Sequence, residues 1–330
     1  MAEAWVDLLD PDEATIGARA PVELHPTAVA RLARRDGLPR PSIEGHDTYV
    51  LVVLLAAVVV PEEDRVFYQE IDLVVTAEQL LVIRKTPTGE HPFDPADAVA
   101  ACPPGERPAM QAQFVVDTVA ERYLDLMDAM NDEIDELEEG IETWASTQVR
   151  GRISELRHDL LHVRRTLAPT RDAIRAIVDR RVDIGEGPEV LPRDVELNFA
   201  DAYDKLLRAT DGLDLSRDLL ASARDYSQAK IANDQNEVVK RLTVIASLLL
   251  VPTFIVGVYG QNFNHIPELS WAFGYWWSWG WIVFTTILQL AFFRWLGWIG
   301  GGQMRRLRVP PLQTLDPRSL RGRRRRPSST

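Results

Sequence analysis

Cysteine is almost absent from this chain, which has a single one, Cys102, in 330 residues. One cysteine excludes an intrachain disulfide framework and a cysteine-rich metal site. The sequence also lacks a glycine-rich phosphate loop and any recognisable serine or cysteine nucleophile motif. It therefore predicts a protein that is not an enzyme and that carries no organic cofactor.

Charge is nearly absent from a long stretch in which Glu268 is the one formal charge between Arg241 and Arg294. Two apolar runs lie in this stretch, residues 242–258 and 271–293, and they are 17 and 23 residues long. A helix crosses the hydrocarbon core of a bilayer with about 20 apolar residues. We expect two transmembrane helices in a lipid bilayer, joined by a short extracytoplasmic loop.

Basic residues are concentrated after the second span. Residues 294–330 carry ten arginines and one acid, a net charge of +9, so residues 1–293 carry −21 of the total of −12. Basic residues next to a span stay on the cytoplasmic side, and residues 1–7 lack the pattern of a signal peptide. We expect both termini on the cytoplasmic side of the cytoplasmic membrane, with the basic tail touching anionic lipid and not nucleic acid.

Residues 1–110 have the pattern of a cytoplasmic α/β domain. Apolar and β-branched runs at 49–60, 66–75 and 79–84 predict strands, and residues 28–34 predict a short helix. The first of these runs is too short to cross a bilayer, so we interpret it as a buried strand.

Long helices are predicted for the next part of the cytoplasmic region, residues 111–241. Apolar residues recur at helical spacing up to about residue 166, and Gly140 or Gly151 would mark a break between two helices. Pro169 allows a kink or a turn. The fold class expected is therefore an α+β cytoplasmic domain with long helices, followed by two C-terminal transmembrane helices.

A stalk helix is predicted from about residue 194, because residues 194–251 contain no proline and one glycine. Apolar residues recur along it at coiled-coil spacing: Leu206, Leu213, Leu220, Ile231, Val238, Leu242, Ile245 and Leu249. The face of a self-contained bundle would explain the first three. It explains less well a seam that continues past Arg241, so we favour self-association.

The loop at residues 259–270 begins with the pentapeptide Tyr259, Gly260, Gln261, Asn262 and Phe263. Two helices cannot enclose a pore, so conduction requires an oligomer in which each loop residue forms a ring. Mg²⁺ gives up its water reluctantly, and a ring of neutral oxygens such as the Asn262 amide can hold the hydrated ion. Gly260 allows close approach of the backbone.

Two further features of this region favour a cation pathway. A candidate pore-lining stripe follows the first span, with small or polar members facing the axis and apolar members forming a dewetting constriction: Asn236, Val239, Leu242, Ala246, Leu250, Thr253 and Gly257. Ordinary packing of small residues explains the stripe by spacing alone, but the adjacent loop favours the pore. Glu268 would form an acidic ring that attracts cations, or it is a lone solvated acid.

These residues resemble the CorA family of divalent-cation channels, whose loop usually reads Tyr-Gly-Met-Asn-Phe, with Gln261 here at the methionine. Further resemblance lies in residues 164–172, 236–243 and 267–269. It implies a funnel-shaped homopentamer that transports Mg²⁺ or Co²⁺. It also implies that Asp201 helps to bind a regulatory Mg²⁺ between subunits, closing the channel.

Three functions remain open from the sequence. The leading one is a divalent-cation channel gated by intracellular cation, and the alternatives are a Zn²⁺ transporter of the ZntB-like branch or a non-conducting membrane sensor or scaffold. His158 and His162, four apart on a predicted helix, could bind one metal. Arg157, Arg164 and Arg165 nearby disfavour that site.

Overall fold

The computed structural model describes residues 5–35, 39–60, 65–86, 93–182, 190–262 and 266–299. The chain divides into two compact units, Met1–Lys230 and Ile231–Thr330. Phe263 and the tail after residue 299 lie outside the described residues.

A five-stranded sheet forms the centre of the first unit. Its strand order is β1-β5-β4-β3-β2, with β1 parallel to β5 and every other pair antiparallel. The strands are β1 (Trp5–Leu9), β2 (Ser42–Gly45), β3 (Val50–Val60), β4 (Arg65–Val75) and β5 (Leu80–Arg84). The three strands predicted from the sequence are confirmed as β3, β4 and β5.

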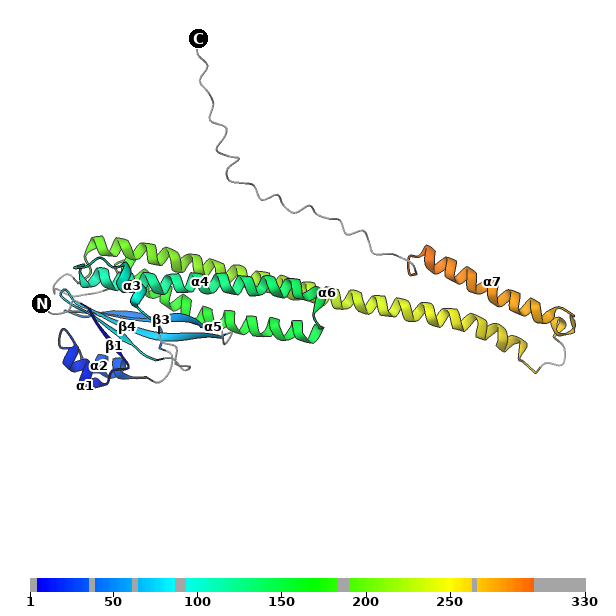
Figure 1. The fold of residues 1–330 in the computed structure, drawn as a ribbon, viewed down its shortest axis with the longest axis horizontal. Helices are drawn as coiled ribbons and strands as arrows, with labels where there is room; N and C mark the ends of the chain where they lie inside the picture. Colours follow the sequence, from blue (N-terminus) through cyan, green and yellow to red (C-terminus); the bar gives the residue numbers. More distant parts are fainter. Residues whose placement is uncertain are drawn as a thin grey trace, which may run out of the picture. The chain divides into compact units, whose positions relative to one another are not determined.

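Helices cover both faces of the sheet (Figure 1). On one face, Leu51 and Val53 of β3 pack with Leu32 in a cluster formed by α1 (Glu13–Arg19) and α2 (Pro26–Ala33). On the other face, alternate residues of β3 pack against the long helices, and the Tyr123 hydroxyl donates to the Leu55 carbonyl at 2.8 Å. The continuous apolar run is therefore a strand buried on both sides.

Two long antiparallel helices follow α3 (Ala96–Ala101), and they are α4 (Pro108–Thr143) and α5 (Ser146–Val178). The predicted break between two helices is confirmed, but it lies at residues 144–145 and not at Gly140 or Gly151, which are both inside helices. The chain turns at Trp144, whose N–H donates to the Gly140 carbonyl at 2.7 Å. A Cβ on Gly140 would lie 2.5 Å from the Trp144 ring, so glycine makes room for the ring that closes the turn.

Pro169 does not produce a turn, because α5 continues through it to Val178. The last long helix, α6, extends from Arg193 to Tyr259. Its first part belongs to the first unit, where Leu206, Leu213 and Leu220 are buried in the main core. For these three leucines the bundle face, and not self-association, explains the heptad.

The second unit contains the remainder of α6, a short 3₁₀ helix η2 (Pro267–Ser270) and α7 (Gly274–Trp295). By length and composition, one helix among the described residues, α6, is long and apolar enough to cross a membrane. The tryptophans of α7 lower its mean hydropathy, so its crossing stays a prediction. Its large apolar side chains are nevertheless exposed, as on Trp276 (74%) and Ile287 (60%).

Candidate ion-conduction site

The loop begins where α6 ends, at Tyr259. The Gly260 N–H donates to the Val256 carbonyl at 2.9 Å, which closes the last helical turn. A Cβ on Gly260 would lie only 3.2 Å from that carbonyl oxygen, so the turn leaves little room for a larger residue. The chain therefore leaves α6 through a tight turn at Gly260, and Gln261 and Asn262 follow this turn.

Gln261 and Asn262 are both exposed. Within the part of the chain that the structure describes, neither side-chain amide has a hydrogen-bond partner. Their oxygens are therefore available to a ligand or to its water. A single chain contributes one such amide pair and no enclosed site.

The seven residues of the predicted pore-lining stripe are all exposed in the single chain: Asn236, Val239, Leu242, Ala246, Leu250, Thr253 and Gly257. The opposite face of α6 is the covered one, where Val244 is buried and Ser247 is half-buried. Gln289 of α7 donates to the Ser247 carbonyl at 3.1 Å on this covered side. The packing of α7 thus leaves the stripe open to another partner.

Gln289 was not among the residues singled out from the sequence. The signal for it is a lone long polar side chain inside an apolar span, which needs a partner away from water. Its amide also lies 3.4 Å from the Ser247 hydroxyl oxygen. This polar contact joins the two apolar helices within the second unit.

The end of the loop forms the short 3₁₀ helix η2. Glu268 lies in η2 and is half-buried. Its carbonyl oxygen would lie 2.2 Å from a Cβ on Gly274, so α7 can begin close to η2 only at a glycine. The aromatic cluster that follows includes Tyr275 and Trp276, which are exposed and have the composition of an interfacial belt.

Asp201 lies on α6 in the first unit, at a groove of about 560 Å³ between α4 and α6 that is also lined by Asp117 and Asp204. Lys205 neutralises part of this charge, with its Nζ 2.7 Å from Asp117 and 2.8 Å from Glu121. Burial alone would lower the pKa of Lys205, but these two hydrogen bonds raise it. Asp201 itself is exposed.

The acids around Asp201 do not converge into a metal site. Among the described residues, no group of three His, Cys, Asp or Glu side chains is placed to hold a metal ion. The predicted regulatory site between subunits therefore stays a prediction.

The fold and the site together define a membrane protein with a large α/β unit and a pair of apolar helices around an exposed Gly-Gln-Asn turn. The family model described as CorA-like Mg²⁺ transporter protein matches residues 3–295. The chain belongs to this family. Its members are channel-type transporters of divalent cations, so the predictions of divalent-cation transport and of no enzymatic activity are confirmed.

The similarity extends over most of the chain. It is 27% identical over 302 residues to YfjQ of Bacillus subtilis, which bears a provisional name as a metal ion transporter, and covers 89% of both chains. It is 27% identical over 240 residues to the cobalt/magnesium transport protein CorA of Thermotoga maritima, covering 72% of this chain and 66% of that one.

A solved structure confirms the fold. The complete CorA magnesium transporter of Methanocaldococcus jannaschii superposes with a TM-score of 0.71 at 20% identity, over 89% of this chain and 91% of that one. The predicted fold class, an α/β domain with long helices and an apolar C-terminal region, is therefore correct.

Proposed function

We propose that the chain forms a homopentameric channel that passes Mg²⁺, and also Co²⁺, across the cytoplasmic membrane. Residues 1–110 and 111–241 would form the cytoplasmic funnel. Residues 242–258 and 271–293 would cross the bilayer, with residues 259–270 outside and the basic tail, residues 294–330, inside.

One observation carries this proposal, the exposure of the whole stripe from Asn236 to Gly257 on the face of α6 turned away from α7. Apolar members such as Leu250, 70% exposed, cannot face water without cost. In a ring of copies, α7 would face lipid while the stripe faces the axis. The apolar positions would then form a constriction that gates by dewetting.

Selectivity would arise at the exposed turn after α6. A ring of Asn262 amide oxygens would bind Mg²⁺ through its water, because the ion sheds its hydration shell reluctantly. Gly260 shapes the turn, with Tyr259 and Phe263 on either side. A ring of Glu268 carboxylates would raise the local cation concentration at the outer mouth.

Gating would depend on Asp201 in the α4–α6 groove. Acidic surfaces of neighbouring copies repel one another, and a bound Mg²⁺ between them offsets that repulsion. Asp201 and the pore-lining stripe are both on α6. An ion bound at Asp201 would therefore restrain the same helix that carries the stripe. Replete Mg²⁺ would thus favour the closed arrangement.

Uptake of Mg²⁺ by reconstituted protein carrying Asn262→Ala tests the channel. We expect transport to be abolished while assembly stays normal, because the Asn262 side chain is exposed and makes no hydrogen bond within the described residues. Flux of Mg²⁺, Co²⁺, Ni²⁺ and Zn²⁺ through the wild type is measured alongside.

The flux results separate the three possible functions. Preference for Zn²⁺ over Mg²⁺ would favour the ZntB-like alternative, and no flux of any cation would favour a sensor or scaffold. Wild-type Mg²⁺ uptake by Asn262→Ala would exclude the selectivity ring. Size-exclusion chromatography of both proteins checks that assembly is unchanged.

A further inference from the structure

Two histidines of α5 bring their ring nitrogens close together. His158 and His162 are four residues apart, and their Nε2 atoms are 3.0 Å apart. Their ring centroids are 4.4 Å apart, with the planes at 66°. His158 is exposed and His162 is half-buried, so both are accessible from solvent. We propose that this pair is a binding site for a nitrogen-preferring transition-metal cation, Ni²⁺ or Co²⁺.

The separation of the two nitrogens favours particular metals. Imidazole nitrogen binds such ions at about 2.0–2.1 Å, so two nitrogens at the observed separation subtend about 90° at the ion. Neighbouring ligands in octahedral and square-planar complexes meet at this angle, whereas Zn²⁺ prefers the wider tetrahedral angle. Mg²⁺ takes oxygen ligands and would not compete.

Metal binding requires one change of tautomer. Without metal, the two rings share a hydrogen bond in which one Nε2–H donates to the other Nε2. A metal ion needs the lone pairs of both Nε2 atoms, so the donor ring must carry its proton on Nδ1 instead. Water can move that proton from Nε2 to Nδ1 of the donor ring.

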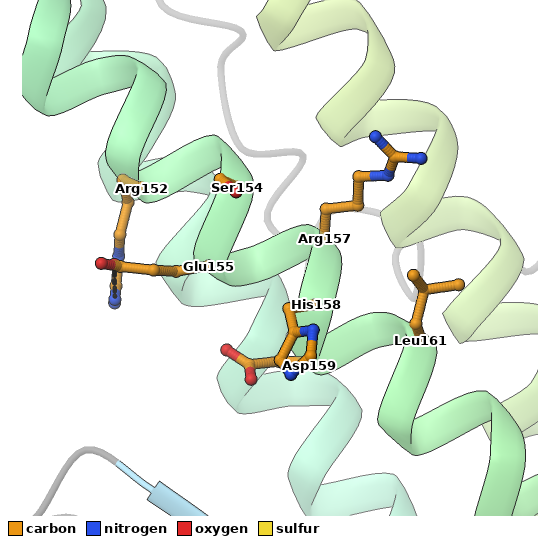
Figure 2. Close-up of a pocket in the computed structure, with 7 residues that line it drawn as sticks. All are labelled: Arg152, Ser154, Glu155, Arg157, His158, Asp159 and Leu161. Atoms are coloured by element: carbon orange, nitrogen blue, oxygen red, sulfur yellow. Dashed lines mark hydrogen bonds and ion pairs between the residues drawn. The ribbon is translucent and has the colours of Figure 1, made fainter.

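The charges around the two histidines disfavour a bound cation less than the sequence suggests. Figure 2 shows Arg157 directed toward the neighbouring helix, while Arg152 and Glu155 pair with each other. Arg152 also meets Glu133 of α4 at 3.0 Å, so its charge is balanced by two acids. Arg164 and Arg165 follow His162 by two and three residues on α5. Both are exposed, so solvent screens their charges.

The site has two protein ligands. Among the described residues, no third His, Cys, Asp or Glu completes a metal-binding cluster with the pair. His158 is exposed, which leaves room for water on the ion. His158 also lines a pocket of about 600 Å³ with Ser154 and Asp159, whereas His162 is not one of its lining residues. Two imidazoles and several waters make an exchangeable site, unlike the closed coordination of structural metals. The site would therefore distinguish Ni²⁺ or Co²⁺ from Mg²⁺ in the first unit.

Calorimetric titration of tag-free, full-length protein in detergent with NiCl₂ tests the proposal. Excess Mg²⁺ is present throughout to occupy oxygen-ligand sites. We expect one nitrogen-ligated Ni²⁺ per chain, and a loss of roughly a hundredfold in affinity for His158→Gln or His162→Gln, because each removes half of a chelate. His46→Gln is the matched control, since His46 stacks on Tyr49 at 4.3 Å and is remote from the pair in sequence; it should bind Ni²⁺ as the wild type does.

Unchanged Ni²⁺ affinity in the double variant would overturn the proposal. Equal and merely additive small losses in the two single variants would overturn it too, because independent imidazoles do not chelate. The visible spectrum of bound Co²⁺ provides a second readout. A weak six-coordinate band that is lost in both single variants supports the site, and an intense tetrahedral band contradicts the geometry. Circular dichroism verifies that these exposed substitutions leave the helices folded.

Discussion

The two parts of α6 have the same kind of repeat and opposite burial. Leu213, in the first unit, is 2% exposed, whereas Leu249, in the second, is 65% exposed. The first lies against α4, where Ser216 of α6 donates to the Asn131 side-chain oxygen at 2.7 Å. Among the described residues, α7 lies beside the second, on another face of α6. A coiled-coil pattern therefore predicts that a stripe of apolar residues is buried. It does not indicate whether the same chain or another copy covers that stripe.

The same contrast extends to polar groups. In the first unit, the buried Lys85 forms ion pairs with Glu70 and Asp72. The second exposes two side-chain amides at Gln261 and Asn262, and they have no partner among the described residues. The first unit thus buries the apolar face of its part of α6 in its own core, whereas the apolar repeat of the second unit is exposed in the single chain.

We expect the largest change in stability from Lys85→Met, which removes the positive charge beside two buried carboxylates. Lys85 is 5% exposed, and its Nζ lies 2.6 Å from Glu70 and 3.0 Å from Asp72. Removing it leaves two buried carboxylates unpaired, so we expect a loss of about 3–5 kcal/mol in the free energy of unfolding. Chemical denaturation of the whole protein, followed by a probe in the first unit, measures it.

The pH dependence of the free energy of unfolding provides a control for this prediction. Burial and then repulsion by Glu70 raise the pKa of Asp72 to about 7 in spite of Lys85. Between the ordinary aspartate pKa and pH 7, the folded state therefore binds more protons than the unfolded state, and the contribution of Asp72 to stability rises as pH falls. Asp72→Asn should remove that slope, and an unchanged slope would contradict the assignment.

A pair of leucine substitutions tests the comparison directly. Leu213→Ala opens a cavity inside the first unit, so it should cost about 2–5 kcal/mol of unfolding free energy. Leu249→Ala touches an exposed position and should change that free energy by less than about 0.5 kcal/mol. Thermal unfolding in detergent compares the two. Equal losses would mean that Leu249 is buried by another copy under those conditions.

The elements that the sequence predicts well are those that depend on local patterns. The apolar run of residues 49–60 has the composition of a strand covered on both faces, and β3 has that environment. The turn at Trp144 has neither proline nor glycine in its centre, because it depends on the Trp144 ring packing over Gly140. Strand β1 pairs with β5 across about 75 residues, which no local pattern indicates.

The candidate site shows the same limit. Residues 259–262 could be singled out because an oxygen-rich turn between apolar spans is unusual. The contact between Gln289 and Ser247 depends on how two helices pack, so it appears only in the structure. The predicted ligand partners of Asp201 stay a prediction, because no metal-binding cluster is found among the described residues.

Asp201→Ala should affect gating without affecting folding. That result would show that the fold of the first unit does not depend on Asp201, whereas regulation by Mg²⁺ does. Asp201 is exposed, so we expect a change of less than about 0.5 kcal/mol in stability. Closure by high Mg²⁺ should weaken, because one ligand between subunits is lost. Protease protection in millimolar Mg²⁺ and in chelator measures this, and equal protection of variant and wild type would exclude Asp201 as a ligand.

The smallest effect is expected at the loop, for Gln261→Met. Gln261 is exposed and donates no side-chain hydrogen bond within the described residues, so the turn formed by Gly260 and Asn262 should persist. Methionine is also the residue that CorA-family loops usually have here. We expect Mg²⁺ flux close to that of the wild type, measured beside Asn262→Ala in the same vesicles. Loss of flux would make the Gln261 amide a ligand of the hydrated ion, and the exposed pair would then act together. Retained flux would restrict that role to Asn262, because a thioether cannot replace an amide oxygen toward the water of Mg²⁺.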